Sequence, residues 1–179
     1  STNKQTTKAP YVRDSIDLKR TMIVVVLSLL PAFVFGIYNV GLQSPEVTTH
    51  NFLDCFIYGL YIVLPMYMVV FGVGGLCEAI FAVMRKHEIN EGFLVTGFLI
   101  PLTMPPTVPL WMLAIATIFG VVIGKEIFGG TGYNVFNPAL LARAFLFFSY
   151  PVYMSGNKVW TIDGVSQATP LLSVSSNIS

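Results

Sequence analysis

Residues 53–84 read LDCFIYGLYIVLPMYMVVFGVGGLCEAIFAVM, an apolar run in which Asp54 and Glu78 are the only charged residues. A helix rises about 1.5 Å per residue, so one helix of this length exceeds the roughly 30 Å of hydrocarbon in a bilayer. Pro65 and the glycine-rich residues 72–75 predict a kink or a tilt that fits the helix to the membrane. This run therefore predicts a membrane-spanning helix.

Further apolar segments precede and follow this run. Residues 21–40 are uncharged and long enough to cross a bilayer, with Pro31 inside them. The later segments are shorter, and Pro138 is expected in the first turn of the last of them. They lie at residues 92–104, 110–124 and 139–150, with a proline-rich turn at 105–109. The sequence thus predicts an all-α integral membrane protein with about five transmembrane or partly re-entrant helices.

The composition agrees with a membrane protein. Hydrophobic residues make up 54% of the 179 residues and charged residues 11%, with a mean hydropathy of +0.71, whereas soluble domains are about 25% charged. The net charge is +1 and no basic stripe occurs, which excludes nucleic acid as a partner. Cys55 and Cys77 both lie in apolar runs, so neither a disulfide framework nor a cysteine metal site is expected.

Basic residues near the ends of the segments predict the orientation. Lys19 and Arg20 precede the first segment, Arg85 and Lys86 follow the second, and residues 41–51 contain no Lys or Arg. Because positive residues favour the cytoplasmic side, the N-terminus is expected inside and the proline-rich turn outside. Lys125 then lies inside again. The expected organisation is a cytoplasmic segment at 1–20 without signal-peptide features, a helical membrane domain at 21–151 and an external polar loop at 152–179.

Glu78 is the first candidate functional residue. Its neighbours in Gly74-Gly75-Leu76-Cys77-Glu78-Ala79-Ile80-Phe81 are apolar or small, and an ionised carboxylate there costs several kcal/mol unless it is paired or hydrated. A cation site is one interpretation. A second interpretation is an ion pair with Arg85, two helical turns further along, or snorkelling toward the boundary.

The glycines of the fourth segment favour helix packing. Gly120 and Gly124 have the spacing that lets two helices approach closely, and Gly75 with Ala79 is a looser version of it. Gly124-Lys125-Glu126 lacks both the glycine spacing and the hydroxyl residue of a phosphate loop. A nucleoside triphosphate site is therefore rejected.

Polar and aromatic residues gather after the fourth segment. The polar side chains of residues 131–143 could form hydrogen bonds with the edge of a heterocyclic ring, although such residues are commonly turn and cap residues. The aromatic run 144–148 could form one wall of a pocket for a flat apolar ligand such as a quinone, or face lipid. The polar groups are Thr131, Tyr133, Asn134, Asn137 and Arg143.

Three stretches resemble a known family. They are residues 85–93, 120–132 and 137–148, and they are similar to the B subunit of the sodium-translocating NADH:quinone oxidoreductase, a bacterial respiratory membrane flavoprotein. The resemblance runs from about Pro10 over nearly the whole chain and corresponds to the N-terminal half of that subunit. It implies that the other half supplies an inverted repeat.

The resemblance implies a covalent flavin. The family attaches FMN by a phosphoester to a threonine in a Ser-Gly-Ala-Thr type of motif, and a separate flavin transferase makes the bond. Ser166-Gln167-Ala168-Thr169 stands at that place, between Asp163-Gly164 and Pro170-Leu171. Thr169 is thus the implied attachment residue, with Asp163, Gly164, Ser166 and Ala168 completing the motif. Gln167 departs from the usual glycine.

The resemblance also implies three further sites. A non-covalent riboflavin corresponds to Thr96, Asn134 and Asn137, which lie near the inner face in the expected orientation. Quinone binding corresponds to Phe145 and Phe147 and to the pair Gly74 and Gly75. Sodium uptake corresponds to Glu78. No metal site beyond the transported sodium ion is implied.

Together these implications describe a multi-pass subunit of the bacterial inner membrane. Electrons would pass from FMN through riboflavin to quinone, coupled to sodium translocation with other subunits of the complex. A competing hypothesis is the membrane flavoprotein subunit of the ferredoxin:NAD oxidoreductase complex, which shares the flavin motif. A flavin-free channel or transporter would also fit the interrupted helices and Glu78, and a structural scaffold is a further hypothesis.

Overall fold

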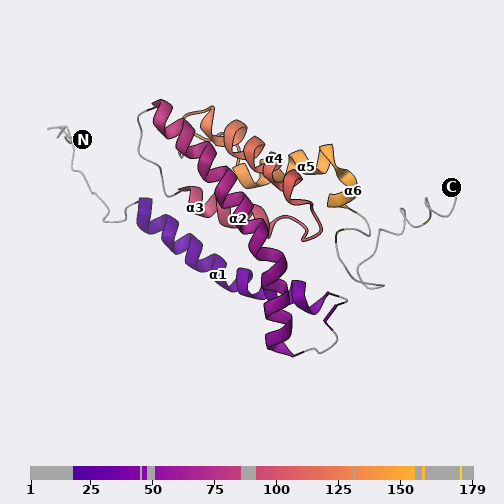
Figure 1. Cartoon of the computed structure of the whole chain (residues 1–179). Coiled ribbons are helices and arrows are strands. Elements are labelled where there is room, and N and C mark those ends of the chain that lie inside the picture. Colours follow the sequence, from indigo (N-terminus) through magenta and orange to yellow (C-terminus); the bar gives the residue numbers. More distant parts are fainter. Residues whose placement is uncertain are drawn as a thin grey trace.

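A computed structural model describes residues 18–44, 46–47, 51–85, 92–130, 132–155, 159 and 174. The described residues form helices joined by turns and contain no strand, which confirms the all-α prediction. In chain order the elements are α1 (Leu18–Leu42), α2 (Phe52–Arg85), α3 (Gly92–Leu102), α4 (Leu110–Val121), the π-helix η1 (Val122–Glu126), α5 (Pro138–Ser149) and α6 (Pro151–Met154) (Figure 1).

The helix bounds follow the sequence expectations within a few residues. α2 is one helix through Pro65 and the glycine-rich run. Pro138 lies in the first turn of α5, as expected, and Asn137 caps this helix. The Asn137 Oδ1 atom accepts hydrogen bonds from the backbone N–H groups of Ala139, at 2.9 Å, and Leu140, at 3.4 Å. The cap satisfies donors that otherwise have no partner within the helix.

α2 is the helix against which α1, α3 and α4 pack (Figure 1). α1 crosses its first half, where glycines bring the two backbones together. A Cβ atom on Gly59 would lie 1.8 Å from the Ile37 carbonyl oxygen, and one on Gly41 would lie 1.7 Å from that of Cys55. α3 and α4 meet the second half of α2, and α5 packs on α4. Small residues thus fix the α1–α2 crossing.

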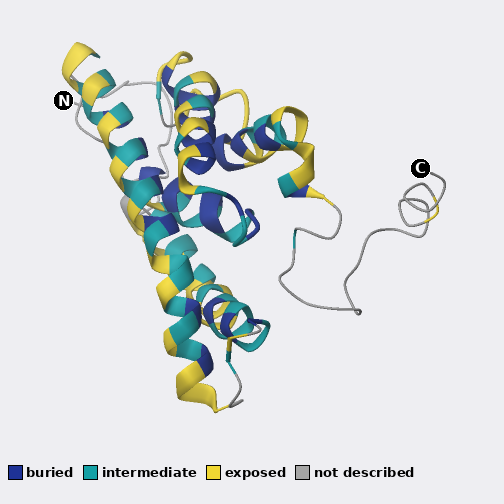
Figure 2. Cartoon of the chain, turned by 45° about the vertical axis from the view of Figure 1, so that its right-hand side comes forward, coloured by how far each residue is buried: buried dark blue, intermediate teal, exposed yellow. Residues whose placement is uncertain are grey.

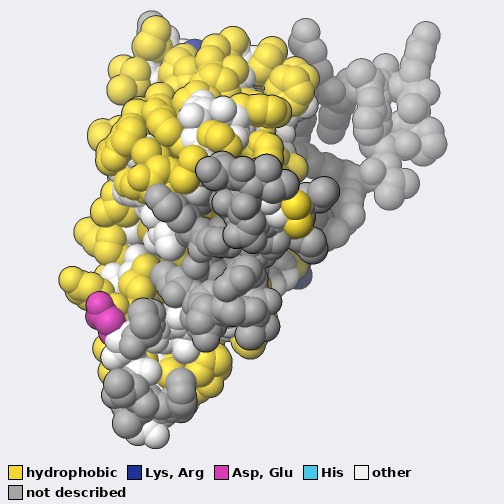
Figure 3. Space-filling view, turned by 90° about the vertical axis from the view of Figure 1, so that its right-hand side faces the viewer, with side chains coloured by type: hydrophobic (Ala, Val, Ile, Leu, Met, Phe, Trp, Pro, Cys, Tyr) yellow, Lys and Arg dark blue, Asp and Glu magenta, His cyan; other side chains and the backbone are white. Residues whose placement is uncertain are grey.

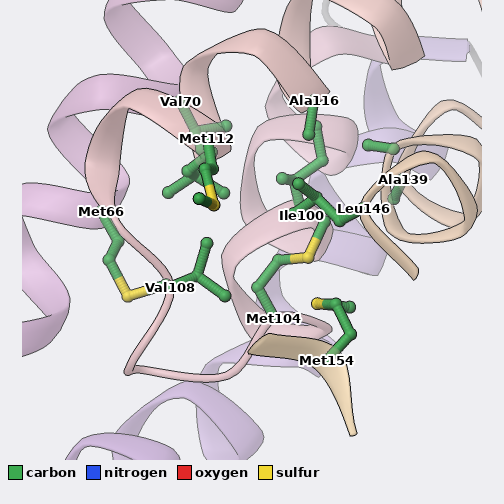
Figure 4. Close-up of a cluster of buried hydrophobic side chains, with 12 residues drawn as sticks. Met66, Val70, Ile100, Met104, Val108, Met112, Ala116, Ala139, Leu146 and Met154 are labelled. Carbon is green, nitrogen blue, oxygen red and sulfur yellow. The ribbon is translucent and has the colours of Figure 1, made fainter. Parts of the chain in front are cut away.

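The core lies where α2, α3, α4 and α5 meet (Figure 4). Met104, just before the proline-rich turn, and Val108 within it belong to this core, so part of the turn is buried. Methionines from separate elements fill the irregular space between the helices, as their flexible side chains allow. The buried cluster comprises Met66, Val70, Ile100, Met104, Val108, Met112, Leu113, Ala116, Ala139, Ala142, Leu146 and Met154.

The described surface is strongly apolar. Phe35 on α1 is 67% exposed, and Tyr61 and Val83 on α2 are 77% and 79% exposed. Figure 2 shows exposed residues along the helices, and Figure 3 shows that hydrophobic side chains make up most of the described part of one face. α1 from Arg20 and the whole of α2 are long and apolar enough to cross a membrane. Soluble monomers rarely expose apolar area on this scale, so the surface indicates a membrane protein.

Candidate functional site

Four charged side chains meet at the end of α2, and we call them the ion cluster. Glu78 and Arg85 lie two helical turns apart on α2, and Lys125 and Glu126 lie on η1. The Lys125 ammonium group donates a hydrogen bond to the Glu78 Oε1 atom. Both side chains of this pair are 5% exposed. Helices remote in sequence therefore bury an acid and a base against each other.

The second pair of the ion cluster joins Arg85 to Glu126. The Arg85 Nη1 atom lies 3.6 Å from Glu126 Oε2, and Arg85 also donates to the Glu126 backbone carbonyl. The Arg85 guanidinium group lies 5.5 Å from the centre of the Phe81 ring. Arg85 thus pairs with Glu126, and Glu78 takes Lys125 as its partner. The interpretation that Glu78 pairs with Arg85 is wrong.

The π-helix explains how two consecutive residues join the cluster. The Ile127 N–H group donates to the Val122 carbonyl oxygen at 3.0 Å, a bond that spans five residues. A π-helical turn is wider than an α-helical turn and is frequent at functional sites. Lys125 and Glu126 are both buried in this turn. Lys125, expected as an inside boundary charge, is therefore an interior residue.

Gly120 at the end of α4 and Gly124 within η1 are packing residues, as their spacing predicts. A Cβ atom on Gly120 would lie 2.5 Å from the Pro138 carbonyl oxygen and 2.8 Å from the Ala142 Cβ atom. A Cβ atom on Gly124 would lie 3.1 Å from a Leu141 methyl group. The close approach of α5 thereby holds the backbone of η1 next to α2.

The ion cluster is electrically balanced, with two carboxylates and two cationic groups. Removing such charges from water is unfavourable, and the mutual attraction offsets this only when each charge keeps a partner. Among the described residues, no group of three or more His, Cys, Asp or Glu side chains could hold a metal ion. The arrangement is suited to holding an ionised carboxylate in an apolar interior, with one monovalent cationic group against it.

The glycines predicted for quinone binding lie at a helix junction. Gly74 is buried, and a Cβ atom there would lie 2.6 Å from the Phe93 ring on α3 and 3.3 Å from Thr117 on α4. A Cβ atom on Gly75 would lie 3.8 Å from the same ring. In this structure Gly74 serves the packing of α2 against α3 and α4.

The two phenylalanines predicted for quinone binding lie in different surroundings. Phe145 packs against the core and stacks on Phe119 of α4, with 4.5 Å between the ring centres. Phe147 is half exposed and meets the edge of Phe148, whose side chain is largely exposed. The aromatic run therefore divides between the interior and the surface.

The residues predicted for riboflavin belong to two elements. Thr96 is buried in α3, and its hydroxyl group donates to the Gly92 carbonyl oxygen at 3.3 Å. Asn134 and Asn137 lie on the exposed turn before α5, where the Asn134 amide donates to the Phe136 carbonyl oxygen. These hydrogen bonds are local, as expected for turn and cap residues.

Arg143 joins the end of α3 to α5. Its Nη1 atom donates to the Thr103 carbonyl oxygen at 2.7 Å. We expect Arg143→Met to lower the free energy of unfolding by about 0.5–1.5 kcal/mol, because the last turn of α3 loses a donor. Thermal unfolding of the detergent-solubilised protein measures this effect. Arg20→Met at the exposed start of α1 is the control, and equal stability of the two variants would contradict the assignment.

The predicted flavin motif lies outside the described residues. This applies to Asp163, Gly164, Ser166, Ala168 and Thr169. Of the residues that the structure brings together, the sequence interpretation named Glu78 but missed the roles of Lys125 and Glu126. Two adjacent charges between the apolar residues Ile123 and Ile127 were the available signal.

A cavity of about 130 Å³ lies between α1, α2 and α3. Its lining is mainly apolar and includes Phe33, Asn39 and Tyr67. Pockets for drug-sized ligands measure about 300–1,000 Å³. The cavity is too small to enclose a flavin or a quinone ring with its tail, and none of the predicted site residues lines it.

The family comparison covers nearly the whole chain. The sequence profile of the NQR2, RnfD, RnfE family matches residues 5–178. A Pseudomonas aeruginosa protein is 49% identical over 90% of this chain and 46% of its own length. A Stutzerimonas stutzeri protein is 50% identical over 90% of this chain and 46% of its own length. A Neisseria meningitidis protein is 47% identical over 93% of this chain and 47% of its own length. Each is named as the B subunit of Na(+)-translocating NADH-quinone reductase. The chain spans about half the length of these relatives.

Proposed function

This chain belongs to the NQR2, RnfD, RnfE family, and we propose that it is part of the B subunit of a sodium-translocating NADH-quinone reductase. The observation that carries the proposal is 49% identity over 90% of the chain to a relative with that name. The apolar surface of α1 and α2 supports a place among other membrane subunits and lipids. The bacterial inner membrane is the proposed location, since these relatives are bacterial.

FMN and riboflavin are the proposed cofactors. FMN would be bound covalently through its phosphate to Thr169, with Asp163, Gly164, Ser166 and Ala168 around it, after the action of a flavin transferase. When bound, the two flavins would supply the one-electron and two-electron chemistry that joins NADH oxidation to quinone reduction. The support for Thr169 is the motif in the sequence, since this motif lies outside the described residues.

The turn before α5 fits an isoalloxazine edge. Asn134 and Asn137 are exposed there, beside the exposed rings of Tyr133 and Phe136. The Asn137 Oδ1 atom caps α5, so its amide nitrogen is the group that would donate to a ring acceptor. Thr96 would contribute from α3, where its hydroxyl group now bonds within its own helix.

Quinone and sodium are the proposed substrates of the assembled complex. Phe147 would offer an exposed ring at the surface of α5, and Phe145 would offer a ring that packs on Phe119 toward the interior. Gly74 and Gly75 would shape the quinone region through the position of the Phe93 ring. Glu78 would take up sodium, and the burial of its carboxylate beside Lys125, on an otherwise apolar helix, supports a role for this residue beyond solubility.

A second candidate is the membrane flavoprotein subunit of the ferredoxin:NAD oxidoreductase complex. The matching family includes RnfD and RnfE as well as NQR2. The three relatives with 47–50% identity, however, all carry the quinone reductase name. We therefore favour the quinone reductase over this candidate, and over a flavin-free transporter or a scaffold.

Intact mass measurement tests the flavoprotein assignment. We expect the denatured chain, expressed in its native organism, to carry one added mass equal to FMN less water. Thr169→Ala removes the hydroxyl group proposed to form the phosphoester, so the added mass is expected to disappear. Thr161→Ala is the matched control and is expected to retain the added mass. An unmodified native chain would contradict the flavoprotein assignment, and a modified Thr169→Ala chain would contradict the attachment residue.

A further inference from the structure

We propose that Lys125 is an internal counter-cation of Glu78, and that sodium competes with the Lys125 ammonium group for the Glu78 carboxylate. The proposal rests on the proposed role of Glu78 in sodium uptake. It adds a specific residue, Lys125, that sets how strongly the carboxylate attracts sodium. Lys125 acts through Glu78 and is a positioning residue.

The first support is the contact itself. The Lys125 ammonium group donates to Glu78 Oε1, and this is the ion pair that Glu78 makes among the described residues. Both side chains are 5% exposed. A carboxylate buried to this extent requires a compensating charge. An ammonium group and a sodium ion carry the same charge, so either of them can supply it.

The second support is that Lys125 has another carboxylate within reach. Its Nζ atom lies 3.9 Å from Glu126 Oε1. Lysine carries its charge on a flexible four-carbon chain. The ammonium group can therefore leave Glu78 for Glu126 by a short movement, without entering an uncharged environment.

The third support is the fixed backbone around this side chain. Gly124, the residue before Lys125, packs against Leu141 and Pro138 of α5. Movement of the side chain alone then suffices for the exchange.

Arg85 is the most exposed member of the ion cluster, at 30%, whereas Glu126 is 8% exposed. Arg85 is thus the member of the ion cluster nearest the surface of the described chain, and Glu78 and Lys125 are the most buried.

The test uses the assembled complex with the full-length subunit. The rate of NADH-driven quinone reduction is measured against sodium concentration, with choline chloride holding the ionic strength constant. We expect Lys125→Met to lower the half-saturating sodium concentration by about tenfold or more, because the competing charge within 4 Å is gone. Lys125→Arg keeps a cation and is expected to retain a high sodium requirement.

Arg85→Met is the matched control. It removes one positive charge from the same cluster, but Arg85 pairs with Glu126 instead of Glu78. We expect a smaller decrease in half-saturating sodium concentration than in Lys125→Met, because the unpaired Glu126 carboxylate draws the Lys125 ammonium group only partly away from Glu78. An equal shift in Arg85→Met and Lys125→Met would overturn the specific role of Lys125.

The remaining outcomes separate the two proposals. If the unaltered complex reduces quinone without any sodium dependence, the proposed sodium function fails, and the competition fails with it. If the unaltered complex depends on sodium and Lys125→Met has the same or a higher sodium requirement, only the competition fails.

A second measurement needs no variant, since loss of the ion pair can prevent assembly. The unaltered complex is treated with a membrane-permeant amine-acylating reagent in sodium or in choline, and the Lys125 peptide is quantified by mass spectrometry. We expect sodium to increase acylation of Lys125 several-fold, because the displaced ammonium group loses its most buried partner. Equal acylation in both salts, in a preparation that shows sodium-dependent activity, would overturn the proposal.

Discussion

Gly59→Ala is expected to separate α1 from α2 and to lower the free energy of unfolding by about 1–3 kcal/mol or more. The added Cβ atom would lie 1.8 Å from the Ile37 carbonyl oxygen and 2.8 Å from the Ile37 carbonyl carbon. Both are backbone atoms of a helix, so no side-chain rotation can relieve the clash. Unfolding of the purified subunit in mixed detergent micelles, followed by circular dichroism, measures the loss.

Gly72→Ala is the matched control in the same helix. A Cβ atom on Gly72 would meet nothing within 4 Å. Alanine there is expected to stabilise α2 by about 0.5–1 kcal/mol, because it restricts the unfolded chain more than glycine does. The two variants should therefore shift stability in opposite directions. A loss of similar size in both would show that helix crossing is not the reason for the effect.

Lys125→Leu is expected to have the second large effect, a loss of about 3–5 kcal/mol, because it leaves the buried Glu78 carboxylate without its partner. Glu78→Leu is expected to lower the free energy of unfolding by less than Lys125→Leu does. In that variant Lys125 still has Glu126 Oε1 at 3.9 Å. The same unfolding measurement in mixed micelles compares the two single variants.

The double variant Glu78→Leu/Lys125→Leu completes the cycle. It removes both buried charges and replaces them with apolar side chains, so its stability is expected to approach that of the unaltered protein. Recovery of stability without recovery of sodium-dependent activity would assign the pair to function. A double variant as unstable as Lys125→Leu would contradict this and show that packing around the pair dominates.

The helices were largely predictable from the sequence, because apolar length and proline positions act locally. The run at 53–84 predicted α2 nearly to the residue, and Pro138 predicted the start of α5. The π-helical end of α4 was not predictable, since it depends on the close packing of Gly120 and Gly124 against α5. The burial of the proline-rich turn likewise depends on helices that meet only in the folded chain.

The sequence alone identified Glu78 as a candidate functional residue but did not identify its partner in the ion cluster. Glu78 stood out because a carboxylate in an apolar run is unusual at any tertiary arrangement. The sequence did not identify Lys125 as its partner, because Lys125 lies 47 residues away and was interpreted as a charge at the membrane boundary. Arg85, which is nearer in sequence, instead binds Glu126. The position of a charge along one helix does not determine its partner when a second helix supplies competing charges.

The short helix α3 has an electrostatic consequence for the fold. It contains 11 residues, which at about 1.5 Å per residue reach only about halfway through the hydrocarbon. Its C-terminal end carries a partial negative charge of about half an elementary unit, and the N-terminal end of α4 carries a similar positive one. The proline-rich turn joins these opposite poles within a few residues. Their opposite signs offset each other, so these two helix ends together add no net charge to the apolar interior.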